Sequence, residues 1–186
     1  MNLTSIFMIG IGLSMDAFAV SIAKGMCLSK KDLAKSAWKL AFYFGLFQAV
    51  MPLLGWWVGS YFQSLIASVD HWIAFILLGI IGGKMIYDAF HPEEVECAPL
   101  TTKLVLILAV ATSIDALAIG VSFAFLQVDI LSAVLIIGIT TFVLSFIAVY
   151  LGNRLGGFLQ KYAELLGGCI LVVIGLKILI EHLFLS

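Results

Sequence analysis

Charged residues are scarce in this chain. Only 11% of its 186 residues are Asp, Glu, Lys or Arg, whereas 63% are hydrophobic, and the mean hydropathy is +1.18. Soluble domains contain roughly 45–50% apolar residues, so the composition excludes an ordinary soluble domain and indicates an integral membrane protein. The net charge of −1 also argues against a nucleic-acid-binding role, because such a role requires a basic surface.

Cysteine is equally scarce. The three cysteines, Cys27, Cys97 and Cys169, are odd in number and show no C-x-x-C spacing. We therefore expect neither a disulfide framework nor a zinc site of that type, and three ordinary thiols instead. The sequence also lacks a G-x-x-x-x-G-K-[ST] phosphate-binding loop. Because no basic region precedes the first apolar segment, we expect that segment to stay in the mature protein.

Long apolar runs dominate what is present. A helix needs about 20 apolar residues to cross a hydrocarbon core of roughly 30 Å, and six runs approach or reach this length. They cover residues 3–23, 40–61, 72–90, 104–126, 130–151 and 163–183. The sequence thus predicts an all-α, polytopic membrane protein with six transmembrane helices.

The basic residues set the orientation. Five lysines lie between the first two spans and two basic residues between the last two: Lys24, Lys30, Lys31, Lys35, Lys39, Arg154 and Lys161. Loops rich in Lys and Arg stay cytoplasmic, and acidic residues weigh little. The basic-free connections at residues 63–70 and 127–129 should then be external, with both termini outside. The acidic third loop, residues 90–103, should be cytoplasmic.

Each half of the chain repeats elements of the other. The phrase S-M-D-A-F-A at residues 14–19 resembles S-I-D-A-L-A at residues 113–118, an offset of 115 − 16 = 99. The L-G of span two recurs in span five (152 − 55 = 97), and I-G-G-K of span three resembles I-G-L-K of span six (177 − 84 = 93). We predict three-helix repeats at residues 1–90 and 104–186, joined by a cytoplasmic linker at 91–103. An odd number of spans inverts the second repeat, and transporters of this kind bind substrate near the midplane.

Asp16 and Asp115 occupy equivalent places in the two repeats. An ionised carboxylate at the bilayer centre costs roughly 2.5–3.5 kcal/mol. We therefore expect both to face a protein-lined pathway and to bind one cation together. The alternative is a neutral, structural carboxyl, which would tolerate replacement by Asn.

Hydroxyls near these carboxylates could complete an oxygen shell. Thr112 precedes Asp115 by three residues and Ser122 follows it by seven, so in a regular helix all three share a face. Ser14 and Ser113 point elsewhere unless the helix is broken or they bond to backbone carbonyls. The alternative for each hydroxyl is a hydrogen bond to its own helix.

Span two offers another oxygen. Pro52 cannot donate to the carbonyl of Gln48, four residues earlier, so Gln48 would present an amide oxygen and a freed main-chain oxygen. Interrupted helices commonly coordinate ions in transporters. The alternative is a packing kink, with Gln48 bonded to a neighbouring helix.

Three further polar groups lie at membrane boundaries or form pairs. Glu164 opens the sixth span and could guard the cytoplasmic entrance, or could be a solvated helix end. Lys84 with Asp88, and Lys177 with Glu181, are spaced for ion pairs. The acidic stretch at residues 91–97 could concentrate divalent cations, or could be a solvated linker.

Oxygen ligands suit hard cations such as Mg²⁺, Ca²⁺ and Mn²⁺, and two carboxylates match a divalent charge. The choice among these cations is narrowed by a set of short motifs spread along the chain. They are F-G at 44–45 with Gln48, P-L-L-G-W at 52–56, H-W-I-A-F at 71–75, G-G-K-M-I at 82–86, A-T-S-I-D-A at 111–116, F-L-Q-V at 125–128 and A-E-L-L-G-G at 163–168. Together they resemble the bacterial MntP-type manganese efflux pumps of the LysE-like exporter group, across all six spans.

The resemblance implies an exporter of Mn²⁺ in the bacterial inner membrane, with Mn²⁺ as substrate rather than as a resident cofactor. By position, the family's paired acidic residues fall on Asp16 and Asp115, and its Glu opening the last span falls on Glu164. Relatives carry Gln or Glu at position 48. The third loop is acidic here, where some relatives are basic.

The leading prediction is therefore secondary transport of Mn²⁺ by alternating access, with Asp16, Asp115, Gln48, Thr112, Ser122 and Glu164 as candidate ligands. A proton or another counter-ion could drive it. Export of an amino acid or another small organic solute is an alternative, weakened by the lack of an intramembrane Arg. An aspartyl protease is disfavoured because both aspartates lie in S-x-D-A phrases. We predict no enzyme activity, and the sequence does not determine the oligomeric state.

Overall fold

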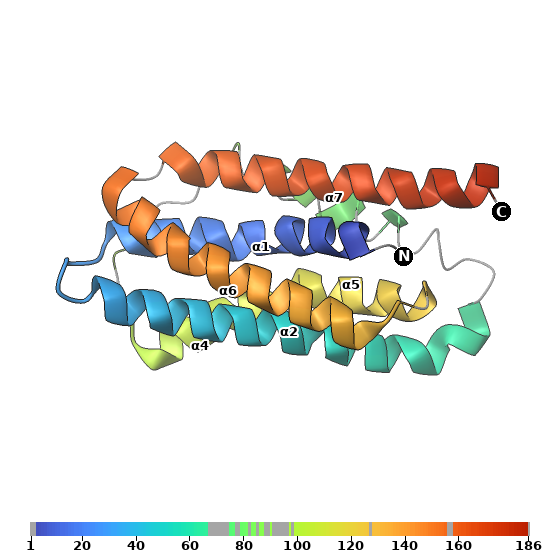
Figure 1. The fold of residues 1–186 in the computed structure, drawn as a ribbon, viewed down its shortest axis with the longest axis horizontal. Coiled ribbons are helices and arrows are strands. Elements are labelled where there is room, and N and C mark those ends of the chain that lie inside the picture. The colour runs from blue at the N-terminus through green and yellow to red at the C-terminus, as the bar shows by residue number, and fades with distance from the viewer. Residues whose placement is uncertain are drawn as a thin grey trace.

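The computed structural model describes residues 3–66, 75–76, 79–81, 83–84, 86–87, 90, 97, 99–126, 128–155 and 158–185. Every regular element within these residues is a helix, which confirms the all-α prediction for this part of the chain. The helices are α1 (Leu3–Met26), α2 (Leu33–Ile66), α4 (Thr102–Ala111), α5 (Ile114–Phe125), α6 (Ile130–Leu155) and α7 (Phe158–Leu185). They lie side by side in one elongated bundle (Figure 1).

Four described segments are long and apolar enough to cross a membrane: Leu3–Met26, Leu33–Tyr61, Thr102–Phe125 and Ile130–Leu155. They correspond to predicted spans one, two, four and five. Predicted span six lies within α7, whose described apolar stretch is Leu165–Lys177. The described residues of predicted span three are helical, and the remainder of that span lies outside the described residues.

The described helices run in both directions along the bundle. α1 runs towards the end where the α1–α2 turn lies, and α2 returns (Figure 1). α4 and α5 run in the same direction as α2 and opposite to α1, so the two S-x-D phrases lie on helices of opposite direction. α1 begins and α7 ends at the end of the bundle far from the α1–α2 turn.

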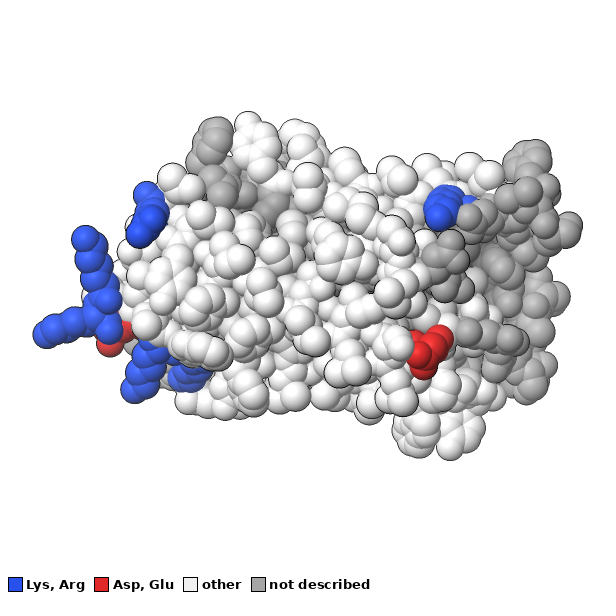
Figure 2. Space-filling model, in the orientation of Figure 1, with Lys and Arg blue, Asp and Glu red and all other residues white. Residues whose placement is uncertain are grey.

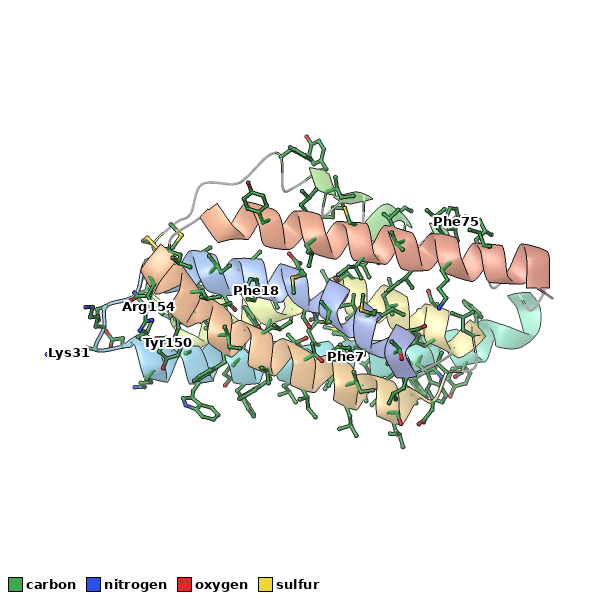
Figure 3. All side chains as sticks on the ribbon, turned by 45° about the horizontal axis from the view of Figure 1, so that its top comes forward. Phe7, Phe18, Lys31, Phe75, Tyr150 and Arg154 are labelled. Carbon is green, nitrogen blue, oxygen red and sulfur yellow. A yellow bond between two sulfur atoms is a disulfide. The ribbon has the colours of Figure 1, made fainter. Side chains whose placement is uncertain are left out.

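Basic side chains gather at the end that holds the α1–α2 turn (Figure 2). Lys31 in that turn and Arg154 in the last turn of α6 both lie there (Figure 3). Large apolar side chains are exposed along the length of the helices, among them Phe42, Trp57, Leu135, Ile139 and Val173. This distribution is what a lipid-facing surface with one basic rim requires.

Two apolar clusters fill the interior. The larger joins α1, α5, α6 and α7 through Leu13, Ile119, Ile137 and Leu171, all fully buried. The smaller lies nearer the basic end and includes Leu40, Phe44, Val105 and Val149. α1 is the most buried of the four candidate spans, so Asp16 lies on the central helix of the bundle.

Glycines allow the helices to cross with their backbones in contact. A Cβ atom added to Gly55 would overlap the Leu117 carbonyl oxygen of α5, and one added to Gly120 would overlap the Pro52 carbonyl oxygen of α2. At the other end of the bundle, Gly152 of α6 meets the Ile22 carbonyl oxygen in the same way. Such small residues let membrane helices approach closely. The α2–α5 and α1–α6 crossings therefore depend on glycine.

The prediction of three free thiols is wrong for two of them. Cys27 and Cys97 form a disulfide, with their Cα atoms 5.3 Å apart, and Cys169 on α7 is free and exposed. The bundle brings together the α1–α2 turn and the segment that leads into α4, where the Lys39 ammonium donates to the Leu100 carbonyl at 3.2 Å. Sequence spacing gave no sign of this meeting, because the two cysteines are 70 residues apart.

Candidate functional site

The fourth predicted span is not one regular helix. α4 ends at Ala111 and α5 begins at Ile114. Side chains take over backbone bonds in between: Ser113 Oγ donates to the Ala109 carbonyl at 2.5 Å, and the Ala116 N–H donates to Asp115 Oδ1 at 2.8 Å. In a regular helix that N–H would serve the Thr112 carbonyl. The break thus frees the Thr112 carbonyl beside Asp115, through side-chain competition with the helix.

Gln48 bridges this break to α1. Its Nε2 donates to the Thr112 carbonyl at 3.2 Å and to the Leu13 carbonyl at 3.1 Å. The side chain is fully buried, and its Oε1 accepts no hydrogen bond from the part of the chain that the structure describes. A buried acceptor without a partner costs about 1–3 kcal/mol. The amide oxygen is therefore a ready ligand for a cation or a water molecule.

The two predicted carboxylates lie in the same region of the bundle. Asp16 on α1 and Asp115 in the first turn of α5 are both partly buried, and they are near enough for the charge of one to act on the other. The Lys84 ammonium also acts electrostatically on Asp115. Asp88, the partner expected for Lys84, lies outside the described residues. One basic side chain and two carboxyl groups thus act on one another in this region.

The two hydroxyls predicted as ligands each donate to a carbonyl of their own helix. Thr112 Oγ1 bonds to Leu108 at 3.0 Å, and Ser122 Oγ bonds to Ala118 at 3.3 Å. Because the helix breaks at Thr112 and Ser113, Thr112 does not continue the α5 face that carries Asp115 and Ser122. A hydroxyl that donates its proton keeps oxygen lone pairs, so these bonds leave both oxygens able to act as ligands.

Sequence reasoning missed two hydroxyls on α6. Thr141 Oγ1 lies 2.8 Å from Ser14 Oγ, and Ser14 in turn donates to the Gly10 carbonyl at 2.5 Å. Ser145 is fully buried, and its hydroxyl has no partner within the described residues. The sequence does contain a sign of this pair of hydroxyls. Thr141 and Ser145 are four residues apart in an otherwise apolar span, so they share one helix face.

The remaining candidates cannot be placed against this site. Glu164 belongs to α7, but its side chain, like that of Glu181, lies outside the described residues, as do residues 91–96. Within the described residues, no group of three or more His, Cys, Asp or Glu side chains could hold a metal ion. A cation at this place would have two carboxylates and otherwise neutral oxygens as ligands.

Gln48 should contribute to stability as well. We expect Gln48→Met, which keeps the volume but removes both N–H donors, to lower the free energy of unfolding by less than the roughly 1–3 kcal/mol of two hydrogen bonds, because it also removes the unpartnered amide oxygen. Ser145→Ala, which removes a buried hydroxyl without a described partner, should be neutral or stabilising. Thermal unfolding in detergent would compare the two variants, and equal stability of both would contradict the bridging role of Gln48.

The sequence was also compared with known proteins. The family model described as "Putative manganese efflux pump" matches residues 30–179, a stretch of 179 − 30 + 1 = 150 residues that runs from the start of α2 into α7. The chain belongs to the MntP family. Together with the four candidate spans, this membership makes it a multi-pass membrane protein.

Relatives in this family match nearly the whole chain. A protein of Clostridium perfringens (strain SM101 / Type A) named "Putative manganese efflux pump MntP" is 50% identical, over 98% of this chain and 96% of its own. A protein of Ruminiclostridium cellulolyticum with the same name is 51% identical, over 99% and 98%. A protein of Clostridium botulinum (strain Hall / ATCC 3502 / NCTC 13319 / Type A), "Putative manganese efflux pump MntP 2", is 52% identical, over 98% and 96%. No solved structure matches the chain.

Proposed function

We propose that the chain exports Mn²⁺ from the cytoplasm by alternating access, and that Asp16 and Asp115 bind the ion at the interface of two inverted repeats. The observation that carries the proposal is the Gln48 amide, which bonds to the carbonyls of Leu13 and Thr112, each three residues before one of the aspartates, and whose oxygen is buried and unpartnered within the described residues. Intramembrane carboxylates are costly, and a divalent cation between them would offset both charges. The relatives' names supply the identity of the ion.

Hydrogen bonds at equivalent positions support the repeat. Gln48 donates to the carbonyls of Leu13 and Thr112, and 112 − 13 = 99, the offset of the two aspartates. Ser14 bonds to Gly10 as Ser113 bonds to Ala109, again with 113 − 14 = 99 and 109 − 10 = 99. The Gln48 amide thus lies where a pseudo-two-fold axis between the S-x-D phrases would pass.

The helix crossings support the same symmetry. Gly55 packs on α5 and Gly152 packs on α1, and these glycines are equivalent under the offset of 97. In each case the second helix of one repeat crosses the first helix of the other repeat. The crossings lie towards opposite ends of the bundle, as expected for halves that insert in opposite directions.

The choice of a hard divalent cation follows from the oxygens. Carboxylate, amide and hydroxyl groups favour Mg²⁺, Ca²⁺ and Mn²⁺ over softer ions. Release of the ion leaves two carboxylates facing each other, and protons could then replace it. Antiport of protons through Asp16 and Asp115 would keep the site close to neutral throughout the cycle. The absence of a phosphate-binding loop from the sequence is consistent with this energy source.

The basic end of the bundle faces the cytoplasm in this proposal. Hydrogen bonds tie the helices together at this end: Asn153 Nδ2 of α6 donates to the carbonyls of Gly25 at 3.2 Å and Leu28 at 2.8 Å. Lys39 donates to Leu100 beside it. Access to the carboxylates from the cytoplasm would require these contacts to open, through movement of one repeat against the other.

Complementation tests the proposed activity. Expression of the chain in bacterial cells that lack their manganese exporter should restore growth at toxic Mn²⁺ concentrations and lower the manganese content of the cells. Empty vector gives the baseline, and immunoblotting of membranes confirms insertion. An inserted protein that changes neither growth nor cellular manganese would overturn the proposal.

A further inference from the structure

The disulfide between Cys27 and Cys97 lies at the basic end of the bundle. Three lysines and one carboxylate, Lys24, Lys35, Lys39 and Asp32, line a pocket of about 500 Å³ together with both cysteines, so its lining is basic overall. Under the proposed orientation this pocket opens to the cytoplasm, where thiols are kept reduced and permanent structural disulfides are rare. A disulfide geometry that is already formed on the reducing side of the membrane is therefore best explained as a reversible one.

We propose that Cys27 and Cys97 are a redox-controlled modification site: a dithiol in the resting cell that low-molecular-weight anionic disulfides oxidise, which blocks transport. The inference rests on the proposed function. Cys97 is exposed and Cys27 partly buried, so a small reagent can reach the pair. Nearby cations favour the reactive thiolate form of cysteine, and the three lysines would attract a reagent that carries carboxylates.

The chemistry balances as two exchange steps. One cysteine thiolate attacks the small disulfide, which forms a mixed disulfide and expels one small thiolate. The second cysteine thiolate then attacks the protein sulfur of the mixed disulfide and expels the other. Two electrons pass from the cysteine pair to the reagent, and the two thiol protons end on the two released small thiols.

The position of the bond explains why it would stop transport. It joins the α1–α2 turn to the segment that leads into α4, so it links the helices that carry Asp16 and Asp115. The Asn153 and Lys39 hydrogen bonds already tie segments together at this end, but they can break and reform freely. A covalent link would prevent the two segments from separating until a thiol reduces it.

Counting thiols tests the modification directly. In full-length protein from acid-quenched cells, denatured and labelled with a maleimide of high mass, we expect all three cysteines to react. Treatment of the cells' inverted membrane vesicles with glutathione disulfide should remove two of the three labels, and dithiothreitol should restore them. The Cys169→Ala variant should also lose two labels on oxidation. Cys27→Ala and Cys97→Ala should not form the internal bond.

Transport and pocket charge give the other readouts. Glutathione disulfide should abolish most Mn²⁺ uptake by inverted vesicles carrying the wild type or Cys169→Ala, and leave Cys27→Ala and Cys97→Ala vesicles active. Lys35→Gln should slow oxidation by glutathione disulfide but not by the neutral hydroxyethyl disulfide.

Three outcomes would each overturn the proposal. Two cysteines could already be oxidised in untreated cells, all three could still be labelled after oxidation, or the oxidised protein could take up Mn²⁺ undiminished. If the reduced wild type moves no Mn²⁺, the proposed function fails, and the thiol counts still decide whether the cysteine pair is redox-active.

Discussion

We expect Asp16→Asn and Asp115→Asn each to reduce Mn²⁺ flux in proteoliposomes by more than about 100-fold, the upper end of the loss typical for mere outer-shell partners of a metal. Asn keeps the size of Asp, and its amide oxygen can still accept the Ala116 N–H bond made by Asp115. The substitution therefore removes charge with little change in packing. With one carboxylate left and otherwise neutral oxygens nearby, a divalent ion would lose half of its compensating charge.

Asp129→Asn is the matched control for this loss. Asp129 is exposed just before α6, where its Oδ2 accepts a 2.5 Å hydrogen bond from Ser132. The same chemical change there should leave flux at the wild-type level. Flux at that level in both Asp16→Asn and Asp115→Asn, at equal protein content, would mean that the carboxylates are structural.

The second large effect concerns folding. We expect Gly55→Ala and Gly120→Ala to destabilise the protein by about 3 kcal/mol or more, at or above the upper end of the range for overpacked cores. In both cases the new methyl group would overlap a backbone carbonyl oxygen of the partner helix, which cannot rotate away as a side chain could. The α2–α5 crossing would have to separate, and with it the support of the break beside Asp115.

Gly10→Ala provides the comparison. A Cβ atom at Gly10 would lie 3.6 Å from the nearest atoms of Ile137, which is ordinary contact, so the variant should fold at the wild-type level. Recovery from size-exclusion chromatography in detergent and thermal unfolding would measure all three proteins. Equal stability of Gly120→Ala and Gly10→Ala would show that the two helices do not touch through their backbones.

The cost of intramembrane charge makes the candidate carboxylates easy to find in the sequence. Asp16 and Asp115 stand out in apolar spans, and their repeated phrases indicate equivalent places; that they bind an ion stays a prediction. Gln48 was also identifiable, because an amide and Pro52 within one apolar span indicate an interrupted backbone. For Gln48 the structure shows the bonds to neighbouring helices that one alternative predicts, while its oxygen lacks a described partner and its role as an ion ligand stays a prediction.

Features that depend on contacts between distant segments were not predictable. The break at Thr112 and Ser113 uses side-chain bonds to Ala109 and Ala116 that compete with an equally good regular helix, and local sequence does not decide between them. The Cys27–Cys97 bond depends on two loops that meet only in the folded bundle. Thr141 bonds to Ser14 because α6 lies against α1. In the sequence its hydroxyl looks like many others in membrane helices.

Binding of Mn²⁺ to the purified protein tests the paired-carboxylate site most directly. Equilibrium dialysis with electron paramagnetic resonance of free Mn²⁺ would give the number of ions bound by wild type, Asp16→Asn, Asp115→Asn and the Asp129→Asn control. We predict a single ion per chain for the wild type and for Asp129→Asn, and loss of that ion in both site variants. Retention of one tightly bound ion by Asp16→Asn and by Asp115→Asn would contradict a site formed by the two aspartates.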